Sequence, residues 1–256
     1  MLDFESVVKE FPRKEQPFKR HILREFLQYQ ILDIIYRSKQ GEKLVFLGGT
    51  ALRIVHNNIR FSEDIDFDNK GLTQKDFSLL SDRIKRELEL EGYKIKIRQV
   101  FKGVYHCYIR FPGLLYAQKL SPLKQEKILI QLDTEPQNFD YVPDKFLMRK
   151  FNFFRHIPVV PVDILLSQKI AALLGRKRSK GRDYFDVTVL FSKTDPNFDY
   201  LSEKLELKNM ADLKERFLLN IKKANLKELA RDVSAFLVDQ NQVDRILLFK
   251  DFVQSL

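Results

Sequence analysis

Two short groups of residues in the first third of the chain have types and spacing suited to phosphate chemistry. Asp64 and Asp66 are separated by one apolar residue, and Gly48, Gly49 and Thr50 precede them. Residues two apart on a strand face the same side, so the two carboxylates are expected to project together. Like charges held this close repel each other unless a cation lies between them, and hard oxygen ligands suit Mg²⁺.

The Gly-Gly-Thr group predicts a seat for phosphate. A turn that opens a helix presents backbone N–H groups at the positive end of the helix dipole, and glycine lets a phosphate approach the backbone. Either group alone is weak, because a chain with 35 acidic residues yields Asp-x-Asp pairs by chance and Gly-Gly usually marks a turn. Within one strand–helix–strand segment, the two groups together predict a site for a metal ion and a triphosphate.

The elements that must position these residues follow from hydrophobic periodicity. The apolar run 44–47 predicts a buried strand, Thr50 is a predicted N-cap for a short helix over 51–56, and alternation predicts an acid-bearing strand over 64–68. An amphipathic helix is expected over 18–37. Thr73 and Asp76 form a capping-box pattern, which predicts a second helix that ends at Gly92.

The remaining pattern divides the chain into two predicted domains. Three further strands are expected over 94–100, 104–111 and 127–133, and prolines at 136, 143, 158 and 161 are expected to interrupt regular structure. After Pro161 the pattern becomes helical, most clearly over 164–175. We therefore predict an α+β fold, with a mixed-sheet domain over 1–157 and a helical domain over 158–256.

Composition limits the classes of function. At 44% hydrophobic residues the chain has enough apolar side chains for a core, and its one cysteine excludes an intrachain disulfide. No apolar run approaches the length of a membrane span and the first residues lack a signal-peptide pattern, so we expect a cytoplasmic protein without a membrane partner. The net charge of +10, mostly within residues 1–157, suits a polyanionic partner, although charge alone fits a merely solvated surface about equally well.

Two sequence blocks resemble a known family. Leu47-Gly-Gly-Thr-Ala-Leu-Arg53 followed by Arg60-Phe-Ser-Glu-Asp-Ile-Asp-Phe67 is similar to the nucleotidyltransferase-like AbiEii/AbiGii toxin family, which includes MenT-type toxins. The second block comprises Gln168-Lys-Ile-Ala-Ala-Leu-Leu-Gly-Arg176 and Gly181-Arg-Asp-Tyr-Phe-Asp186. Both blocks occur in family order within residues 44–190.

The resemblance implies a polymerase-β-type nucleotidyltransferase domain, with the helical domain completing the active site. It implies transfer of NMP from an NTP, with Mg²⁺ held by Asp64 and Asp66, to an RNA acceptor such as the 3′ end of tRNA. It also implies a toxin of a type IV-like pair with a cognate antitoxin. Paired carboxylates suit this chemistry, because metal ions stabilise the attacking and leaving oxygens of an in-line displacement.

The resemblance also implies roles for residues outside the acidic pair. Lys169, in an apolar helical stretch, is expected to reach the triphosphate; an ordinary snorkelling lysine is the alternative. Asp183 and Asp186 share a helix face, and Asp183 is preferred as the functional acid, while charges that complement the helix dipole would account for both. Asp133 is the expected third carboxylate, as metal ligand or base, with Glu135 as its competitor; a plain acid at the end of a strand is the alternative to both.

Basic and polar side chains supply the remaining candidates. The run 176–182 holds five cations, of which Arg176, Lys177, Arg178 and Lys180 are predicted to grip RNA phosphates and Arg182 to bind the nucleotide; a solvated turn is the alternative. Ser62 is a candidate phosphate ligand or turn cap. Arg53 follows Thr50 by one helical turn and is expected to form a structural ion pair, or to pair with Asp64 or Asp66.

Three hypotheses for the function result. The first is an Mg²⁺-dependent nucleotidyltransferase that acts on RNA. The second is a transferase that modifies a protein or a small molecule, and the third is a catalytically inactive, basic nucleic-acid-binding module. The presence of Asp64, Asp66 and Lys169 favours an enzyme, because an inactive site need not keep its acids.

Overall fold

Strands dominate the chain before residue 160, and helices dominate after it. A computed structural model describes residues 3–256. The chain forms two compact units. Unit 1 comprises the described residues up to Asn57 together with Phe61–Val159, and unit 2 comprises Asn58–Arg60 and Val160–Leu256. The chain therefore passes between the units on either side of the short segment Asn58–Arg60, just ahead of Asp64.

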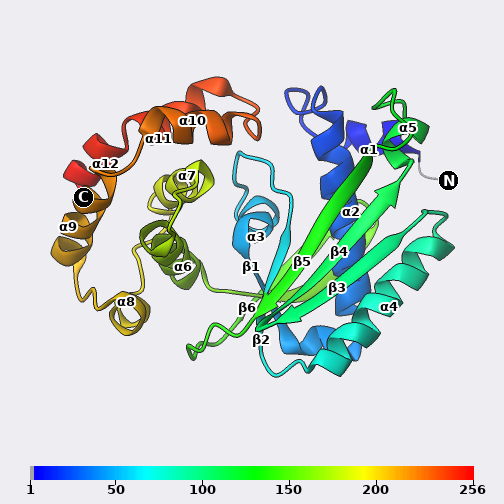
Figure 1. Cartoon of the computed structure of the whole chain (residues 1–256), viewed down its shortest axis with the longest axis horizontal. Helices are drawn as coiled ribbons and strands as arrows, with labels where there is room; N and C mark the ends of the chain where they lie inside the picture. Colours follow the sequence, from blue (N-terminus) through cyan, green and yellow to red (C-terminus); the bar gives the residue numbers. More distant parts are fainter. Residues whose placement is uncertain (1–2) are drawn as a thin grey trace. The chain divides into compact units, whose positions relative to one another are not determined.

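Unit 1 is built on one seven-stranded mixed sheet (Figure 1). The strands lie in the order β3-β4-β5-β2-β1-β7-β6. Strand β2 is antiparallel to β1 and parallel to β5, and β1 is parallel to β7. The bounds are β1 Leu44–Leu47, β2 Ile65–Asn69, β3 Lys96–Lys102, β4 Val104–Pro112, β5 Lys127–Glu135, β6 Asp144–Lys150 and β7 Phe153–Val159. The predicted α+β class is confirmed.

The two faces of this sheet differ in chemistry because side chains alternate along each strand. Ile65, Phe67, Ile109, Ile130 and Leu132 are buried on one face, where they join the core under α2 and α4. The intervening residues project from the opposite face, and they include Asp66 on β2 and Asp133 on β5. The sequence alternation therefore decides which face carries the acids.

Helices α2 and α4 of unit 1 lie where the sequence predicts them, whereas α1, α5 and a 3₁₀ helix are not predicted. Their bounds are α1 Phe4–Lys9, α2 Lys19–Tyr36, α3 Gly48–Ile54, α4 Gln74–Leu90 and α5 Leu114–Ala117, with a 3₁₀ helix at Lys39–Lys43. The capping box at the start of α4 is confirmed: the Thr73 hydroxyl accepts from the Asp76 N–H, and the Asp76 carboxylate accepts from the Thr73 N–H. Two backbone N–H groups that the helix cannot satisfy itself are thereby paired.

Two local predictions are wrong. Helix α3 begins at Gly48 with Leu47 as its N-cap, so Thr50 lies inside the helix, and its hydroxyl donates instead to the backbone carbonyl of Asp64. Pro143 and Pro158 are expected to interrupt regular structure, but residues 144–159 form the β6–β7 hairpin, with Pro158 inside β7. Proline removes only a donor, and the Pro158 carbonyl still accepts from the Tyr36 hydroxyl (3.4 Å).

Unit 2 is helical and has its own core. The bounds are α6 Val162–Gly175, α7 Gly181–Leu190, α8 Phe198–Leu205, α9 Met210–Ile221, α10 Leu226–Ser234, α11 Asp244–Leu247 and α12 Phe249–Ser255, with a 3₁₀ helix at Gln240–Val243. Buried rings join the helices: Phe249 lies 4.8 Å from Tyr184 and 5.6 Å from Phe217, between ring centroids. A Cβ at Gly181 would overlap the Leu229 carbonyl, so glycine permits the close approach of α7 and α10.

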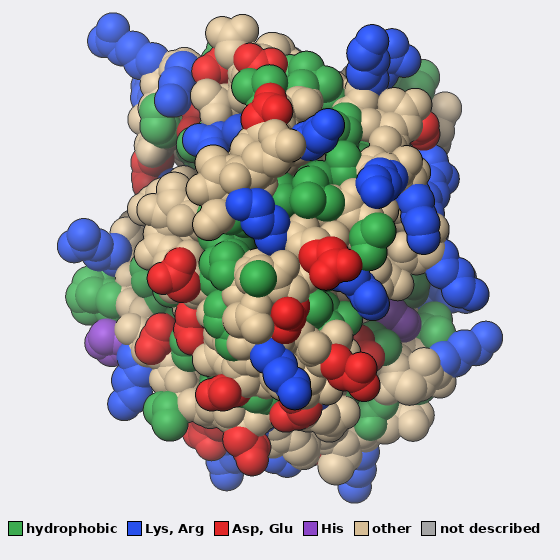
Figure 2. Space-filling model, turned by 90° about the vertical axis from the view of Figure 1, so that its left-hand side faces the viewer, with side chains coloured by type: hydrophobic (Ala, Val, Ile, Leu, Met, Phe, Trp, Pro, Cys, Tyr) green, Lys and Arg blue, Asp and Glu red, His purple; other side chains and the backbone are tan. Residues whose placement is uncertain are grey.

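The surface carries charges of both signs. On the face drawn in Figure 2, acidic and basic side chains are interspersed, so the positive net charge does not gather there in a single patch. None of the helices within residues 3–256 combines the length and the apolar character needed to cross a bilayer.

Candidate active site

Strand β2 carries the acidic pair. Ile65 and Phe67 are buried on the core face, which turns Asp66 to the opposite face, with Asp64 immediately ahead of the strand. In register, Asp66 lies beside Leu47 at the end of β1 and beside Asp133 on β5. Both Asp64 and Asp66 are partly exposed, so a ligand can reach them.

The glycine turn packs directly against this pair. Gly48 has a φ of +81°, a conformation that side chains disfavour, and a Cβ there would overlap the Asp66 carboxylate. Gly49 and Thr50 follow in α3, where both are buried. The turn and the acids therefore form one local structure, in which Gly48 allows the Asp66 carboxylate to occupy its place.

A buried glutamine holds the loop that leads into β2. The Gln28 side chain on α2 is 1% exposed, and its amide donates to the backbone carbonyls of Ser62 (3.2 Å) and Glu63 (2.9 Å). Ser62 is thus held through its carbonyl, two residues ahead of Asp64. Gln28 is not among the candidates predicted from the sequence. Its position among the apolar residues of a predicted helix could have indicated a buried polar group with a structural partner.

Asp133 on β5 is the acid beside Asp66. Its carboxylate accepts hydrogen bonds from His106 Nδ1 (2.7 Å) and Gln131 Nε2 (2.8 Å). The competitor Glu135 lies farther along β5 beside Asp68 and is exposed. His106 is opposite Asp133 in the β4–β5 register, so Asp66, Asp133 and His106 form one row across three strands. Sequence analysis missed His106, because only strand register brings it to Asp133.

Arg53 has a structural role in α3. Its guanidinium pairs with Glu15 (2.5 Å) and Glu25 (3.0 Å), whose side chains are 10% and 5% exposed. Its guanidinium carbon also lies 4.6 Å from the centroid of the Phe61 ring. These contacts agree with the expected structural ion pair. They connect α3 to α2 through Glu25, and to the segment that precedes α2 through Glu15.

A second polar cluster lies within unit 2. Lys169 on α6 places Nζ 2.9 Å from Asp186 Oδ2 and 4.0 Å from Asp183 Oδ1. Asp186 also accepts from Arg60 Nε (2.7 Å) and Nη2 (2.6 Å) and from Asn58 Nδ2 (2.9 Å). Asp186 is fully buried, which by itself raises its pKa, but the cations Arg60 and Lys169 outweigh burial and lower the pKa to about 2.

Asp183 and Asp186 therefore have different environments. The Asp186 carboxylate contacts Arg60, Asn58 and Lys169, so it binds the segment Asn58–Arg60 to α6 and α7. Asp183 is 3% exposed, and its nearest cation is Arg176, with Nε 2.9 Å from Oδ2. Asn58 and Arg60 were not singled out as partners of Asp186, because they lie far from it in sequence.

The basic run divides between a loop and a helix. Residues 176–180 form the loop between α6 and α7, and Lys177, Arg178 and Lys180 are exposed there. Arg176 pairs with Asp183, as above. Arg182 lies in the first turn of α7, with its guanidinium carbon 4.8 Å from the centroid of the Phe236 ring.

A family comparison matches most of the chain. The family model described as "Nucleotidyl transferase AbiEii toxin, Type IV TA system" matches residues 30–254, a range that includes both acidic clusters. The chain belongs to the AbiEii family. It is therefore a nucleotidyltransferase of a type IV toxin–antitoxin family, with an NTP as substrate and an antitoxin as the implied partner. None of the curated proteins compared with the chain matches it.

Solved structures share the AbiEii fold seen here. The crystal structure of JHP933 from Helicobacter pylori is 18% identical, with a TM-score of 0.52 and 92% of each chain covered. A crystal structure of a candidate nucleotidyltransferase from H. pylori is 17% identical, also with a TM-score of 0.52, and covers 92% of this chain and 95% of that one. At this level of identity the likeness shows the fold.

Nucleotidyltransferases of the AbiEii kind generally use a divalent metal. Within residues 3–256, no three His, Cys, Asp or Glu side chains are grouped as a ready-made metal site. Mg²⁺ does not require such a cage, because it usually binds one or two carboxylates together with substrate phosphates and water. Asp64 and Asp66, with Asp133 beside them on the same face, supply the hard oxygen donors that suit this ion.

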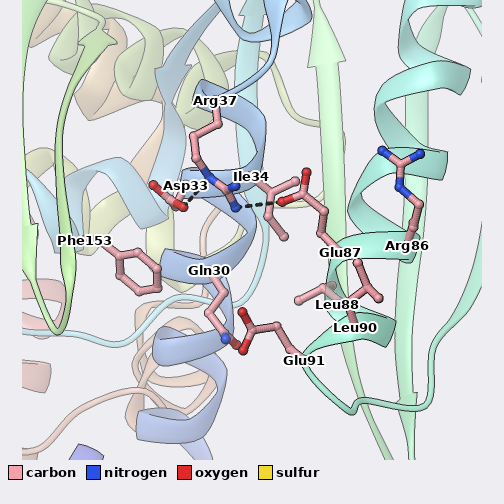
Figure 3. A pocket seen from close by; sticks show the side chains of 10 residues that line it. All are labelled: Gln30, Asp33, Ile34, Arg37, Arg86, Glu87, Leu88, Leu90, Glu91 and Phe153. Atoms are coloured by element: carbon pink, nitrogen blue, oxygen red, sulfur yellow. Dashed lines mark hydrogen bonds and ion pairs between the residues drawn. The ribbon is translucent and has the colours of Figure 1, made fainter.

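The pocket drawn in Figure 3 is separate from these acids. It has a volume of about 380 Å³ and lies between α2 and α4, the helices that cover the opposite sheet face. Arg37 crosses it, pairing with Asp33 and Glu87 at 2.7 Å each. Three of the charged groups that line it, Arg37, Asp33 and Glu87, are thus paired with one another. None of the residues that line this pocket is among the candidate site residues predicted from the sequence.

Proposed function

We propose that this AbiEii enzyme transfers NMP from an NTP to the 3′ end of an RNA acceptor, with tRNA as the leading candidate. The observation that carries the proposal is the row Asp66–Asp133 on neighbouring parallel strands, with Gly48 packed against Asp66. Two carboxylates on one face and a glycine turn beside them are the parts that a metal-bound triphosphate requires.

The residues of unit 1 would bind the metal ion and the phosphates of the nucleotide. Asp64 and Asp66, together with Asp133, would hold Mg²⁺, which when bound stabilises charge on the attacking and leaving oxygens. Gly48, Gly49, Thr50 and Ser62 position the nucleotide phosphates. In the reaction the acceptor hydroxyl oxygen bonds to the α-phosphorus, its proton passes to Asp133 or to water, and the bond to pyrophosphate breaks, so that pyrophosphate leaves. His106 and Gln131 hold the Asp133 carboxylate in place.

The unit 2 residues are proposed to serve the same reaction. Lys169 and Arg182 bind the nucleotide. The Asp183 carboxylate, next to Lys169, is the acidic group of unit 2 that takes part in the reaction. Asp183 is chosen over Asp186 because the contacts of Asp186 with Arg60, Asn58 and Lys169 account for it as a structural anchor. In this proposal residues 158–256 complete the active site.

An RNA acceptor is supported by charge. The chain carries a net charge of +10, and Lys177, Arg178 and Lys180 are exposed on one loop beside Arg176. Cations of this kind bind phosphates and release counterions. A tRNA acceptor places the site of action in the cytoplasm.

The decisive experiment uses each α-labelled NTP in turn with the purified protein and total RNA in the presence of Mg²⁺. Label in a tRNA-sized band supports the proposal, and omission of Mg²⁺ should remove that label. Label on a protein or a small molecule would favour the second hypothesis, a transferase with another acceptor. Absence of label with all four nucleotides would favour a binding module.

The first prediction concerns the acidic pair. Asp64→Ala and Asp66→Ala should each abolish transfer while the melting temperature stays at or above that of the wild type, because removal of one of two adjacent carboxylates relieves repulsion. Melting temperature and labelled product are measured on the same preparations. Wild-type activity in either variant would contradict the metal assignment.

A growth assay extends this prediction to the cell. Growth arrest on expression should disappear in Asp66→Ala at equal protein abundance, and co-expression of the cognate antitoxin should relieve arrest by the wild type. If Asp66→Ala is as toxic as the wild type, the harm comes from binding and not from transfer.

A further inference from the structure

We propose that the sheet face formed by β3, β4 and β5 beside Asp133 binds the single-stranded end of the acceptor RNA. The identity of the acceptor rests on the proposed function above. The face itself is defined by strand register within unit 1, and it differs from the basic loop 176–180 in unit 2.

Strand register places three successive rows on this face. The first row is Asp66–Asp133–His106, described above. The second is Gln131–Tyr108–Arg98, and the third is Leu129–Arg110–Lys96. Rows are two residues apart along each strand, so the third lies roughly 13 Å from the first. The second and third rows contain no acid.

The side chains of these two rows are available to a ligand. Lys96 and Arg98 are exposed, Leu129 is 38% exposed, and Tyr108 and Arg110 are half-buried. Helices α2 and α4 pack on the opposite face, against Ile109, Ile130 and their neighbours. The rows therefore present an aromatic ring and three cations next to the acidic row.

The aromatic and basic groups are arranged as a stacking surface. The Tyr108 ring lies 6.2 Å from His106, with 30° between the ring planes, and the Arg110 guanidinium carbon lies 5.7 Å from the Tyr108 centroid. An unstacked base can stack on an aromatic ring while nearby cations hold its phosphates, which is how proteins bind single-stranded nucleic acid. Charge complementarity thus favours a polyanion with exposed bases.

Protection of a sheet edge explains only part of this pattern. Cations on an edge strand discourage pairing with another chain, and β3 is an edge strand that carries Lys96 and Arg98. Tyr108 and Arg110 lie on β4, which is paired on both sides, so they need no such protection. Their position next to the acidic row indicates that the acceptor end is guided toward Asp133.

The test measures binding of a fluorescent, unstructured RNA oligonucleotide by anisotropy, without NTP, at several salt concentrations. Tyr108→Ala should weaken binding about five- to hundredfold, because one stacked base is lost, while Tyr108→Phe should bind like the wild type. The double variant Lys96→Ala/Arg98→Ala should weaken binding and reduce the salt slope by about 1.4, the value for two lost cations on a single strand.

The matched control removes the same charge from the other edge of the sheet. Lys145→Ala/Arg149→Ala on β6 changes two exposed cations on an edge strand and should leave RNA binding unchanged. If it weakens binding as much as Lys96→Ala/Arg98→Ala, the effect is that of net charge and the proposed face is wrong. The proposal is also wrong if Tyr108→Ala leaves RNA binding unchanged or reduces NTP affinity by the same factor.

The outcomes separate this proposal from the proposed function. If the wild type transfers label to RNA and the face variants neither bind RNA more weakly nor raise its KM, the face is wrong while the function stands. If the wild type labels no RNA and the face variants still lose RNA binding, the face stands while the function fails. If the label goes to a protein and the face variants reduce only that labelling, without weaker RNA binding, the face binds a protein. The RNA proposal is then overturned.

Discussion

At the scale of single residues, the site depends on close approaches that few side chains would allow. Gly48 combines a left-handed backbone with direct packing against the Asp66 carboxylate, and Asp186 sits fully buried among Arg60, Lys169 and Asn58. The residue type alone would not explain either role. Gly48 matters because it leaves space for the Asp66 carboxylate, and Asp186 matters because it pairs with buried cations. Each position can be tested by a single substitution.

Gly48→Ala should be far more harmful than the same change at a glycine in open space. Its Cβ would displace the Asp66 carboxylate in addition to straining a φ of +81°, so we expect transfer to fall at least about tenfold and stability to fall by about 1–3 kcal/mol. Gly71→Ala is the control, because Gly71 has a φ of +94° and no atom within 4 Å of a Cβ. Equal kinetic effects of the two changes would show that strain alone matters.

Asp186→Asn should change how stability depends on pH. The pKa of Asp186 is lowered from 3.8 to about 2, so ionised Asp186 stabilises the fold above pH 4, and this stabilisation is lost as the pH falls from 4 to 2. The wild type should therefore lose about 2 kcal/mol more than Asp186→Asn over that range. At pH 7 the variant should be about 3–5 kcal/mol less stable, because Arg60 and Lys169 lose their counter-charge.

Denaturant unfolding at pH 7, 4, 3 and 2 provides the measurement. Parallel pH profiles for the wild type and Asp186→Asn would contradict the lowered pKa. Arg37→Ala serves as a comparison, because Arg37 pairs with Asp33 and Glu87 but is itself exposed to solvent, and its loss should cost no more than about 1 kcal/mol.

At the scale of elements, helix α2 connects the core to the acids. Its apolar residues cover the sheet, while the Gln28 amide holds the carbonyls of Ser62 and Glu63 ahead of β2. Pairing of buried carbonyls is needed for stability, and here the same hydrogen bonds set the position of Asp64.

Cys107 on β4 has a structural role only. Its thiol is buried, and burial raises its pKa to about 11, so we expect the thiol to resist alkylation.

Gln28→Ala should lower kcat more than it weakens NTP binding. It leaves two backbone carbonyls without their donor and frees the loop that carries Asp64, so we expect a loss of about 1–3 kcal/mol in stability and a several-fold loss in kcat. Gln30→Ala on the same helix removes the hydrogen bond from the Tyr93 hydroxyl (2.9 Å) and should affect stability without affecting kcat. If both variants keep wild-type kcat, Gln28 has no positioning role.

At the scale of the whole molecule, the residues assigned to the reaction belong to two units. The acids and the glycine turn are in unit 1, and Lys169, Asp183 and the basic loop are in unit 2. The chain joins the units next to Arg60, whose guanidinium is held by Asp186. A division of labour between nucleotide and acceptor can therefore be tested by substitutions in unit 2 alone.

Lys169→Ala should weaken NTP affinity or turnover about ten- to hundredfold with every acceptor, because a charge-assisted contact is lost. Neutralising Lys177, Arg178 and Lys180 should instead raise the KM for RNA and flatten its salt dependence, with little change in NTP affinity. Steady-state kinetics at three salt concentrations separate the two effects. If the loop variant loses NTP affinity and keeps the salt slope, the loop belongs to the nucleotide site.

The sequence by itself determined the local parts of this protein. Alternation placed Asp66 opposite a buried face, the capping box at Thr73 and Asp76 started α4, and two motif blocks in order predicted the family. The predictions of the strand face and of the helix start are correct because strand alternation and helix capping depend on neighbours within a few residues. The β6–β7 hairpin was missed, since prolines lower strand propensity locally while pairing with another strand restores it.

Only the tertiary structure decided which distant residues meet. It placed Asp133 rather than Glu135 beside Asp66, gave Asp133 the partners His106 and Gln131, and joined Asp186 to Arg60. Alternation within β5 turns Asp133 to the face of the acids, but which residues of β2 and β4 lie beside it depends on strand register, which the local sequence does not specify. It is set by burial of apolar side chains across the whole sheet, which is why the site emerges only when the sheet is assembled.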